Sequence, residues 1–379
     1  MEKLLKLEAC SSLSQSKGRF VENSDKISDL PTHIAHHILS FLMMEDIARL
    51  SMVSKWWQEL CISIPSLTID GMRYRGKDYK VIRFKNFLDR MMLRRNGMKM
   101  VQFCVRWTFL KWHLDEYRFL TWLHDAIRCN VEVLYLDLCI FIPGALKIPL
   151  CVLHCESLRF LTVSLYGGVL QLPSSSGFTK LQSLSLTRVR VLDELFVERV
   201  LSSCNSLDKL CLDGINGINN INIWSSSLKY LEIRSYEHDD LFHLNVSGEL
   251  LEELIIHWKF TPSGGSLEQL SSSWRPPYLE LFHILEQIEE LMIHAQCLKA
   301  LFKAGILPIP LKHLHTLRIN LSSSDSVDGD VYEAIAVLTK GVANVLGLFI
   351  DVKPSPKKRC PNLSLMHMTT GVHTLKYSL

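Results

Sequence analysis

Histidine and cysteine are the residue types in this sequence whose spacing most resembles that of metal ligands. His33, His36 and His37 fall within about one turn of a predicted helix, a spacing that can bring two imidazoles to one metal ion. Cys151-x2-His154-Cys155 also has ligand-like spacing, but no second ligand pair follows at the distance of a zinc finger. For the histidines we favour solvated side chains on the polar face of a helix. Neither pattern therefore predicts a metal site.

Motifs that carry catalysis are missing from the sequence. It contains no G-x-S-x-G nucleophile elbow, no glycine-rich phosphate loop and no H-E-x-x-H zinc motif. We therefore expect a binding protein that is not an enzyme and that has no catalytic residue and no cofactor.

Composition narrows the class of protein further. The chain has 379 residues, of which 47% are hydrophobic and 21% charged, so it can bury a large core. Its formal net charge of +3 argues against a general nucleic-acid binder. The eleven cysteines are scattered, and neither a signal-peptide core nor an apolar run of about 18 residues occurs. We expect free thiols, a cytoplasmic or nuclear location and no membrane partner.

The N-terminal part consists of a polar segment at 1–26, which we interpret as flexible, and a helical module at 27–70. Pro31 suits the first turn of a helix, because that turn does not use the N–H that proline lacks. From there to Leu60, apolar residues recur at helical spacing in three short helices. So small a unit leaves apolar surface uncovered, and we expect its spare face to bind a partner. The alternative is that these helices cap the following domain.

One sequence pattern, apolar-x-x-apolar-x-apolar, recurs from about residue 98, and we call it the repeat phrase. The step between copies is mostly in the twenties, the range of leucine-rich repeats. The copies begin at Met98, Val131, Leu158, Leu181, Leu207, Leu228, Leu251, Ile288, Leu314, Val345 and, weakly, Leu363.

The phrase has a simple structural meaning. Its last two apolar positions are two apart, so both point inward from a short strand. Helical spacing at 115–127, 195–201 and 279–288 indicates that some connecting segments return as helices. We predict an α/β chain whose repeats at 98–320 stack into an irregular solenoid with a parallel sheet on the concave face. Residues 321–379 are further irregular repeats or a C-terminal extension.

Cysteines recur just before the repeats. Cys129, Cys155, Cys204 and Cys360 each stand two or three residues ahead of a repeat. A small reduced thiol suits the tight packing of such a corner, and this accounts for the cysteines better than a zinc site does.

The linker at 71–97 begins a basic stretch in which Arg and Lys far outnumber acidic residues. We favour a helix that turns its apolar residues toward the core, namely Phe84, Phe87, Leu88 and Met91. The alternative is a docking surface for an acidic partner or a phosphorylated cofactor.

The helical module resembles the F-box. The matching pattern is Leu30-Pro31-x6-Ile38-Leu39-Ser40-Phe41-Leu42-x3-Asp46-x6-Val53-Ser54-Lys55-x-Trp57-x2-Leu60, with Met43-Met44 as a departure from it. The repeats are similar to those of plant-type F-box/leucine-rich-repeat proteins, especially at Arg128-Cys129-Asn130-Val131 and Cys204-Asn205-Ser206-Leu207.

The resemblance implies a substrate-recognition subunit of a Skp–cullin–F-box ubiquitin ligase. In that role the F-box binds a Skp-type adaptor, and through it a cullin, while the repeats bind a target protein. By matching position, the residues that face the adaptor or form the core of the module are Leu30, Pro31, Ile34, Ile38, Leu39, Leu42, Val53 and Trp57. Some relatives hold an inositol phosphate beneath the solenoid, and the sequence does not show whether this chain does. The alternative function is a leucine-rich-repeat scaffold outside any ligase.

Overall fold

The computed structural model describes the chain in two compact units, Met1–Cys61 and Ile62–Leu379. The described residues are 30–71, 78–110, 112–140, 145–172, 178, 180–236, 243–258, 288–303, 313–322, 329–340, 347–353 and 374–377. Among them, no helix combines the length and the apolar character that crossing a membrane requires.

Three helices make up the described part of the first unit, as the sequence predicts. They are α1 (Thr32–Ser40), α2 (Met44–Leu50) and α3 (Lys55–Ile62), whose last residue opens the second unit. Ser54 caps α3, because its Oγ accepts a hydrogen bond from the backbone N–H of Trp57 at 3.2 Å. The side chains that pack inside the unit are Ala35, Leu39, Met44, Ile47, Leu60 and Cys61.

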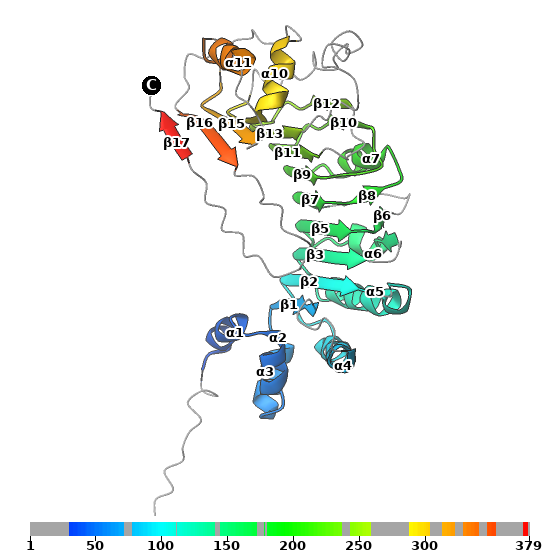
Figure 1. Cartoon of the computed structure of the whole chain (residues 1–379). Helices are drawn as coiled ribbons and strands as arrows, with labels where there is room; N and C mark the ends of the chain where they lie inside the picture. The colour runs from blue at the N-terminus through cyan, green and yellow to red at the C-terminus, as the bar shows by residue number, and fades with distance from the viewer. Residues whose placement is uncertain are drawn as a thin grey trace, which may run out of the picture. The chain divides into compact units, whose positions relative to one another are not determined.

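The second unit is built on one large sheet, drawn as a stack of strands in Figure 1. Within the described residues, twelve strands follow the order β1-β2-β3-β5-β7-β9-β11-β13-β14-β15-β16-β17. Their bounds are β1 (Ser66–Asp70), β2 (Gln102–Phe109), β3 (Val133–Ile140), β5 (Phe160–Tyr166), β7 (Ser183–Thr187), β9 (Lys209–Asp213), β11 (Tyr230–Ser235), β13 (Glu253–Trp258), β14 (Glu290–His294), β15 (Thr316–Ser322), β16 (Gly347–Lys353) and β17 (Thr374–Tyr377).

Helices and short strands fill the connections between the strands of the large sheet. Within the described residues, the helices are α4 (Asp78–Arg95), α5 (Trp112–Arg128), α6 (Leu150–Leu153), α7 (Phe196–Ser203), α10 (Ala295–Lys303) and α11 (Gly329–Lys340). Two small sheets order as β4-β6-β8 and β10-β12. Their strands are β4 (Ala145–Lys147), β6 (Val169–Gln171), β8 (Arg190–Val191), β10 (Asn220–Trp224) and β12 (His243–Ser247). In Figure 1, α5, α6 and α7 lie together on one side of the stack.

The repeat phrase sets the register of the sheet. Leu134 pairs with Leu161, which pairs with Leu184, and the same phrase position continues through Leu210 and Leu231. These leucines are buried, while the residues between them are partly exposed, as expected for strands covered on one face. We call the partly exposed side the open face. The prediction of a parallel repeat sheet is confirmed, and β17 differs because it pairs antiparallel with β16.

The first repeat lies in a different register from the predicted one. Phe103, rather than Val101, pairs with Leu134, and Val101 is exposed. The large sheet also begins before Met98, because Leu67 in β1 pairs with Phe103. The pattern of Ile64, Leu67 and Ile69 is therefore a further copy of the phrase, ahead of the first predicted one.

Cysteine and serine form the corner that precedes several of the strands. The Sγ of Cys204 bonds the carbonyl oxygen of Leu181 at 3.1 Å, and the Oγ of Ser206 donates to the same oxygen at 3.0 Å. Ser157, two repeats earlier, and Ser227, one repeat later, make the same kind of contact at 2.9 Å and 2.8 Å. The interpretation of these cysteines as packed corner residues is confirmed for the described ones, since Cys129 and Cys155 are buried too.

The basic stretch contains α4, which packs against α5. Phe84, Leu88 and Met91 are buried and Phe87 is half-buried, so the predicted inward face is confirmed. Lys85 Nζ reaches Asp115 Oδ1 at 2.5 Å, and this pair joins the two helices.

Some predictions fall outside the described residues. They concern the helix at 279–288, whose last residue alone is described, the corner residue Cys360 and the weak repeat copy that begins at Leu363.

Candidate functional site

The helical unit exposes an apolar surface beside its core. On α1, Ile34 and Ile38 are 40% and 45% exposed, and Phe41, one turn further on, is 73% exposed. Ala35 and Leu39 share the neighbouring stripe, about 100° further round the helix, and are buried. Helical spacing thus divides α1 into a core stripe and a stripe that is free to contact a partner.

The structure places the sequence-predicted site residues in three environments. Ile34, Ile38, Val53 and Pro31 are exposed, and Leu39 is fully buried. The half-buried ones are Leu30, Leu42 and Trp57. Leu39 therefore belongs to the core of the unit, whereas the exposed residues form its surface, a division that the sequence left open.

Three further exposed apolar residues lie on this unit. Phe41, Met43 and Met52 are 73%, 45% and 79% exposed. Phe41 belongs to the F-box pattern, yet the resemblance assigns neither Phe41 nor the two methionines to the site. Apolar identity was the available signal, but it does not distinguish a surface residue from a core residue. We define the apolar surface as Ile34, Ile38, Phe41, Met43, Met52 and Val53.

The open face of the second unit carries charged and aromatic side chains held by their neighbours. In the first repeats, Arg106 Nε lies 3.1 Å from Asp137 Oδ2, and Arg106 Nη1 lies 4.0 Å from Asp70 Oδ2. These three residues occupy the same position on adjacent strands, because Asp70 pairs with Arg106 and Arg106 with Asp137. The row is therefore a chain of ion pairs across β1, β2 and β3.

Glu232 is the centre of a second polar network on this face. Its carboxylate accepts hydrogen bonds from Tyr230 Oη at 2.8 Å and from Arg234 Nε at 2.5 Å. Burial raises the pKa of Glu232, but the hydrogen bond and charge of Arg234 more than offset this and leave the pKa below its ordinary value. Burial and the charge of Glu232 raise the pKa of the Cys211 thiol on the neighbouring strand to about 12.

A cluster of Tyr166, Arg188 and Tyr236 stands where the strands of the open face end. The Arg188 guanidinium lies 5.0 Å from the centroid of the Tyr166 ring. Tyr236 hydrogen-bonds the Asp213 carboxylate, and burial together with that carboxylate raises the pKa of Tyr236 to about 12. Gly214 separates Tyr236 from Arg188, since a Cβ there would lie 3.4 Å from the tyrosine ring and 3.6 Å from Arg188 Cγ.

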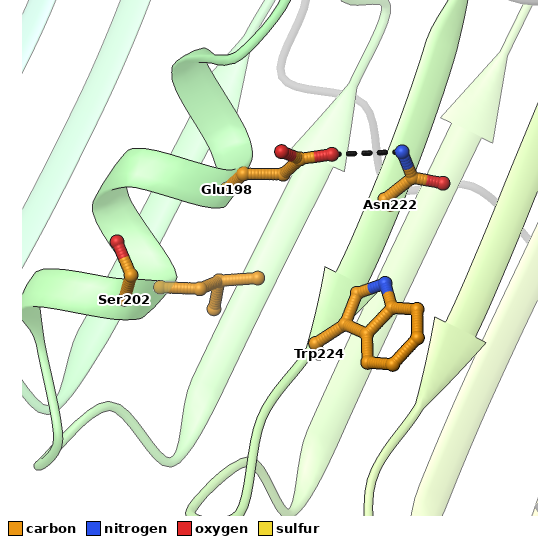
Figure 2. Close-up of a pocket in the computed structure, with 5 residues that line it drawn as sticks. Glu198, Ser202, Asn222 and Trp224 are labelled. Atoms are coloured by element: carbon orange, nitrogen blue, oxygen red, sulfur yellow. Dashed lines mark hydrogen bonds between the residues drawn. The ribbon is translucent and has the colours of Figure 1, made fainter.

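A pocket of about 450 Å³ opens on the helix-bearing side, between α7 and β10. Figure 2 shows Glu198 pointing toward Asn222, whose Nδ2 donates to Glu198 Oε1 at 2.7 Å. Trp224 lies on the same strand as Asn222 and is 63% exposed. A carboxylate beside an exposed indole can contact a cationic side chain.

The metal interpretations of the sequence find no assembled site in the described part of the chain. No three His, Cys, Asp or Glu side chains gather there in a way that could hold a metal ion. His33 and His37 are exposed, and Cys155 is buried at a repeat corner.

Family models match both parts of the chain. A model described as F-box-like matches residues 27–67. A model described as FBD-associated F-box protein At5g56370, LRR repeats, matches residues 119–337, more than half of the chain. The chain belongs to the plant F-box/LRR-repeat proteins. The F-box of this family member corresponds to the three-helix unit, and its leucine-rich repeats form the parallel sheet.

Curated relatives from Arabidopsis thaliana agree with this placement. The putative F-box/FBD/LRR-repeat protein At4g03220 is 28% identical over 249 residues, which are 61% of this chain and 46% of the relative. The F-box/FBD/LRR-repeat protein At5g56420 is 26% identical over 58% of this chain and 52% of its own length. The F-box/LRR-repeat protein At4g14103 is 27% identical over 51% and 50%, respectively. The chain spans about half the length of these relatives.

Proposed function

We propose that this F-box/LRR-repeat protein is the substrate-recognition subunit of a Skp–cullin–F-box ubiquitin ligase. The F-box binds a Skp-type adaptor, which connects it to a cullin, and the repeats bind a target protein. The chain supplies proximity and orientation, while the chemistry of ubiquitin transfer belongs to other subunits. We propose that the protein acts in the cytoplasm or the nucleus.

The observation that carries the proposal is the apolar surface of the F-box. Its members include Ile38, Met52 and Val53, which are 45%, 79% and 67% exposed. Exposed apolar side chains gathered on so small a unit favour a protein partner that covers them. Leu39 contributes indirectly, because it holds α1 in place from the core.

The open face of the repeats supports the second half of the proposal. Repeat sheets present extended surfaces to which partners bind. Here that surface combines ion-pair networks with partly exposed aromatic rings, including Phe160 at 45% and Tyr166 at 37% exposure. Tyrosine and arginine are the residue types that often dominate binding energy at protein interfaces.

A scaffold outside any ligase is the competing function, and partner turnover separates the two. Proteins that co-purify with the wild-type chain are quantified in cells that express either the wild type or Ile38→Asp. The ligase function predicts at least one repeat-bound partner whose half-life lengthens with Ile38→Asp or with proteasome inhibition. Unchanged half-lives of every bound partner in both conditions support the scaffold and contradict the proposal.

A further inference from the structure

The cluster of Tyr166, Arg188 and Tyr236 has the composition of a binding hot spot. Its members come from the ends of β5, β7 and β11, which are separate repeats of the open face. Tyr166 and Tyr236 are 37% and 39% exposed, and Arg188 is exposed between them. Tyrosine offers a large contact area at a small entropic cost, and arginine adds directed hydrogen bonds.

The backbone at Arg188 is held in an unusual conformation. Its φ is +52°, in the left-handed region, where the other non-glycine residues of the described chain are Asn96 and Asn130. Asparagine tolerates this region, whereas arginine pays a steric cost there. The backbone N–H of Arg188 donates to the carbonyl oxygen of Asp213 at 2.6 Å and fixes this geometry. Such strain is typical of functional positions, and here it sets the guanidinium above Tyr166.

The charge of Arg188 is available to a partner. Among the described residues, no ion pair joins the Arg188 guanidinium to a carboxylate. Among the acids on the neighbouring strands, Glu232 bonds Arg234 and Tyr230, and Asp213 bonds Tyr236, while the Oδ1 of Asp213 is buried away from solvent without a hydrogen-bond partner. The first charge that a ligand meets at this edge is therefore positive.

A second cation stands at the opposite ends of the same strands. Lys209 Nζ lies 4.0 Å from the centroid of the Tyr230 ring, and Lys209 is exposed. Lys209 pairs with Ser183, and Asp213 pairs with Thr187, the residue before Arg188. Four residues of a parallel strand span about 13 Å, so the two cations border a stretch about four residues long. The side chains between them are small, including Ser185 and Cys211.

We propose that this part of the open face binds an extended acidic segment of the target protein, with a carboxylate of Asp or Glu on Arg188. This inference rests on the proposed function for the identity of the occupant as a ligase target. Guanidinium and carboxylate form paired hydrogen bonds, and the rings of Tyr166 and Tyr236 pack against the flanking residues of the segment. The aromatic row continues beyond Tyr236, because its ring centroid lies 6.3 Å from that of His257.

Selection from a display library of random dodecapeptides on the purified full-length chain tests the inference. We expect the selected peptides to be enriched in Asp and Glu. A representative peptide should lose affinity about 10- to 100-fold on Arg188→Asn, the range for a charged hydrogen bond. The loss of peptide affinity should be smaller for Arg188→Lys, which keeps the positive charge but lacks the planar guanidinium. Replacing the acidic residues of the peptide by Asn and Gln should weaken its binding to the wild-type chain by a similar factor.

The controls separate folding from recognition. Arg188→Asn keeps a side chain suited to positive φ, and its thermal unfolding should match that of the wild type within about 2 °C for so small a change. Trp224→Ala removes an aromatic ring of higher exposure from the helix-bearing side and should leave peptide affinity unchanged.

Three results contradict the inference: no peptide is selected, the selected peptides lack acidic residues, or their binding survives Arg188→Asn. Failure of the ligase function can be told apart from failure of this inference. If the chain selects acidic peptides through Arg188 but does not bind an adaptor, it is a scaffold that has the same peptide site.

Discussion

Arg95 Nη1 donates a hydrogen bond to the carbonyl oxygen of Ile62 at 2.7 Å, from a side chain with no solvent exposure. Its Nη2 also donates to the carbonyl oxygen of Lys99 at 3.1 Å. One guanidinium at the end of α4 thus joins the segment before β1 to the segment before β2. Burial lowers the pKa of Arg95, as expected for a cation taken out of water.

Arg95→Ala should therefore destabilise the chain strongly. It leaves two buried carbonyl oxygens without their donor and opens a cavity, and together these cost about 3–5 kcal/mol. The free energy of unfolding in urea measures the loss. Arg94→Ala, at an exposed neighbour, is the control and should change it by less than about 0.5 kcal/mol. Equal effects of the two substitutions would show that Arg95 has no special role.

The serine corners should contribute a repeated, modest stabilisation. Ser206→Ala removes the hydrogen bond to the Leu181 carbonyl oxygen and should lower the unfolding free energy by about 1 kcal/mol. Ser202→Ala provides the matched control, because Ser202 is exposed and bonds only within its own helix turn. A loss of stability for Ser202→Ala that equals the loss for Ser206→Ala would refute the corner interpretation.

The Glu232 network predicts a defined pH dependence of stability. The pKa of Glu232 is lower in the folded chain than its ordinary value, so the ionised form stabilises the fold at neutral pH. This contribution is complete above the unfolded pKa of about 4.3 and disappears as the pH falls through the lower folded pKa. Glu232→Gln should be less stable than the wild type at pH 7, and the two unfolding free energies should converge in acid. A difference between the two unfolding free energies that grows as the pH falls would contradict this prediction.

Local patterns made the F-box helices and most repeats predictable. Each repeat phrase fixes which residues of a short strand face inward, and helical spacing fixes the stripe of α1 that contains Leu39. These properties require only neighbours in sequence. They do not require knowledge of which repeat lies beside which.

The first repeat shows where the local signal is ambiguous. Met98, Met100, Val101, Phe103 and Val105 are apolar, so the phrase fits this stretch in two registers. Only pairing with β1 and β3 selects the register in which Phe103 meets Leu134. The β1 copy falls outside the regular spacing of the repeats, because α4 separates it from the next repeat.

The candidate sites depended on longer-range geometry. Arg188 and Tyr166 lie at the ends of two adjacent strands, so they come into contact only because one repeat stacks on the next. Neither residue belongs to the repeat phrase. Likewise, Ile38 and Leu39 are adjacent apolar residues with the same sequence signal, yet one is 45% exposed and the other fully buried.

That contrast defines two F-box variants with different expected defects. Leu39→Ala should lower the unfolding free energy by about 2–5 kcal/mol, because it removes buried methyl groups from a small core. Ile38→Asp should cost less, about 1 kcal/mol, because nearly half of the residue is already exposed to solvent. Comparable destabilisation by both substitutions would show that Ile38 belongs to the core.

Co-elution with a co-expressed Skp-type adaptor tests the central claim most directly. Size-exclusion chromatography compares the wild type with Ile38→Asp, Val53→Asp and, as a control, Tyr332→Asp, which places the same charge at an exposed aromatic residue of α11. We predict a stoichiometric complex for the wild type and Tyr332→Asp, and its loss for the two folded F-box variants. A wild-type chain that elutes without the adaptor, or F-box variants that retain it, would contradict the proposed function.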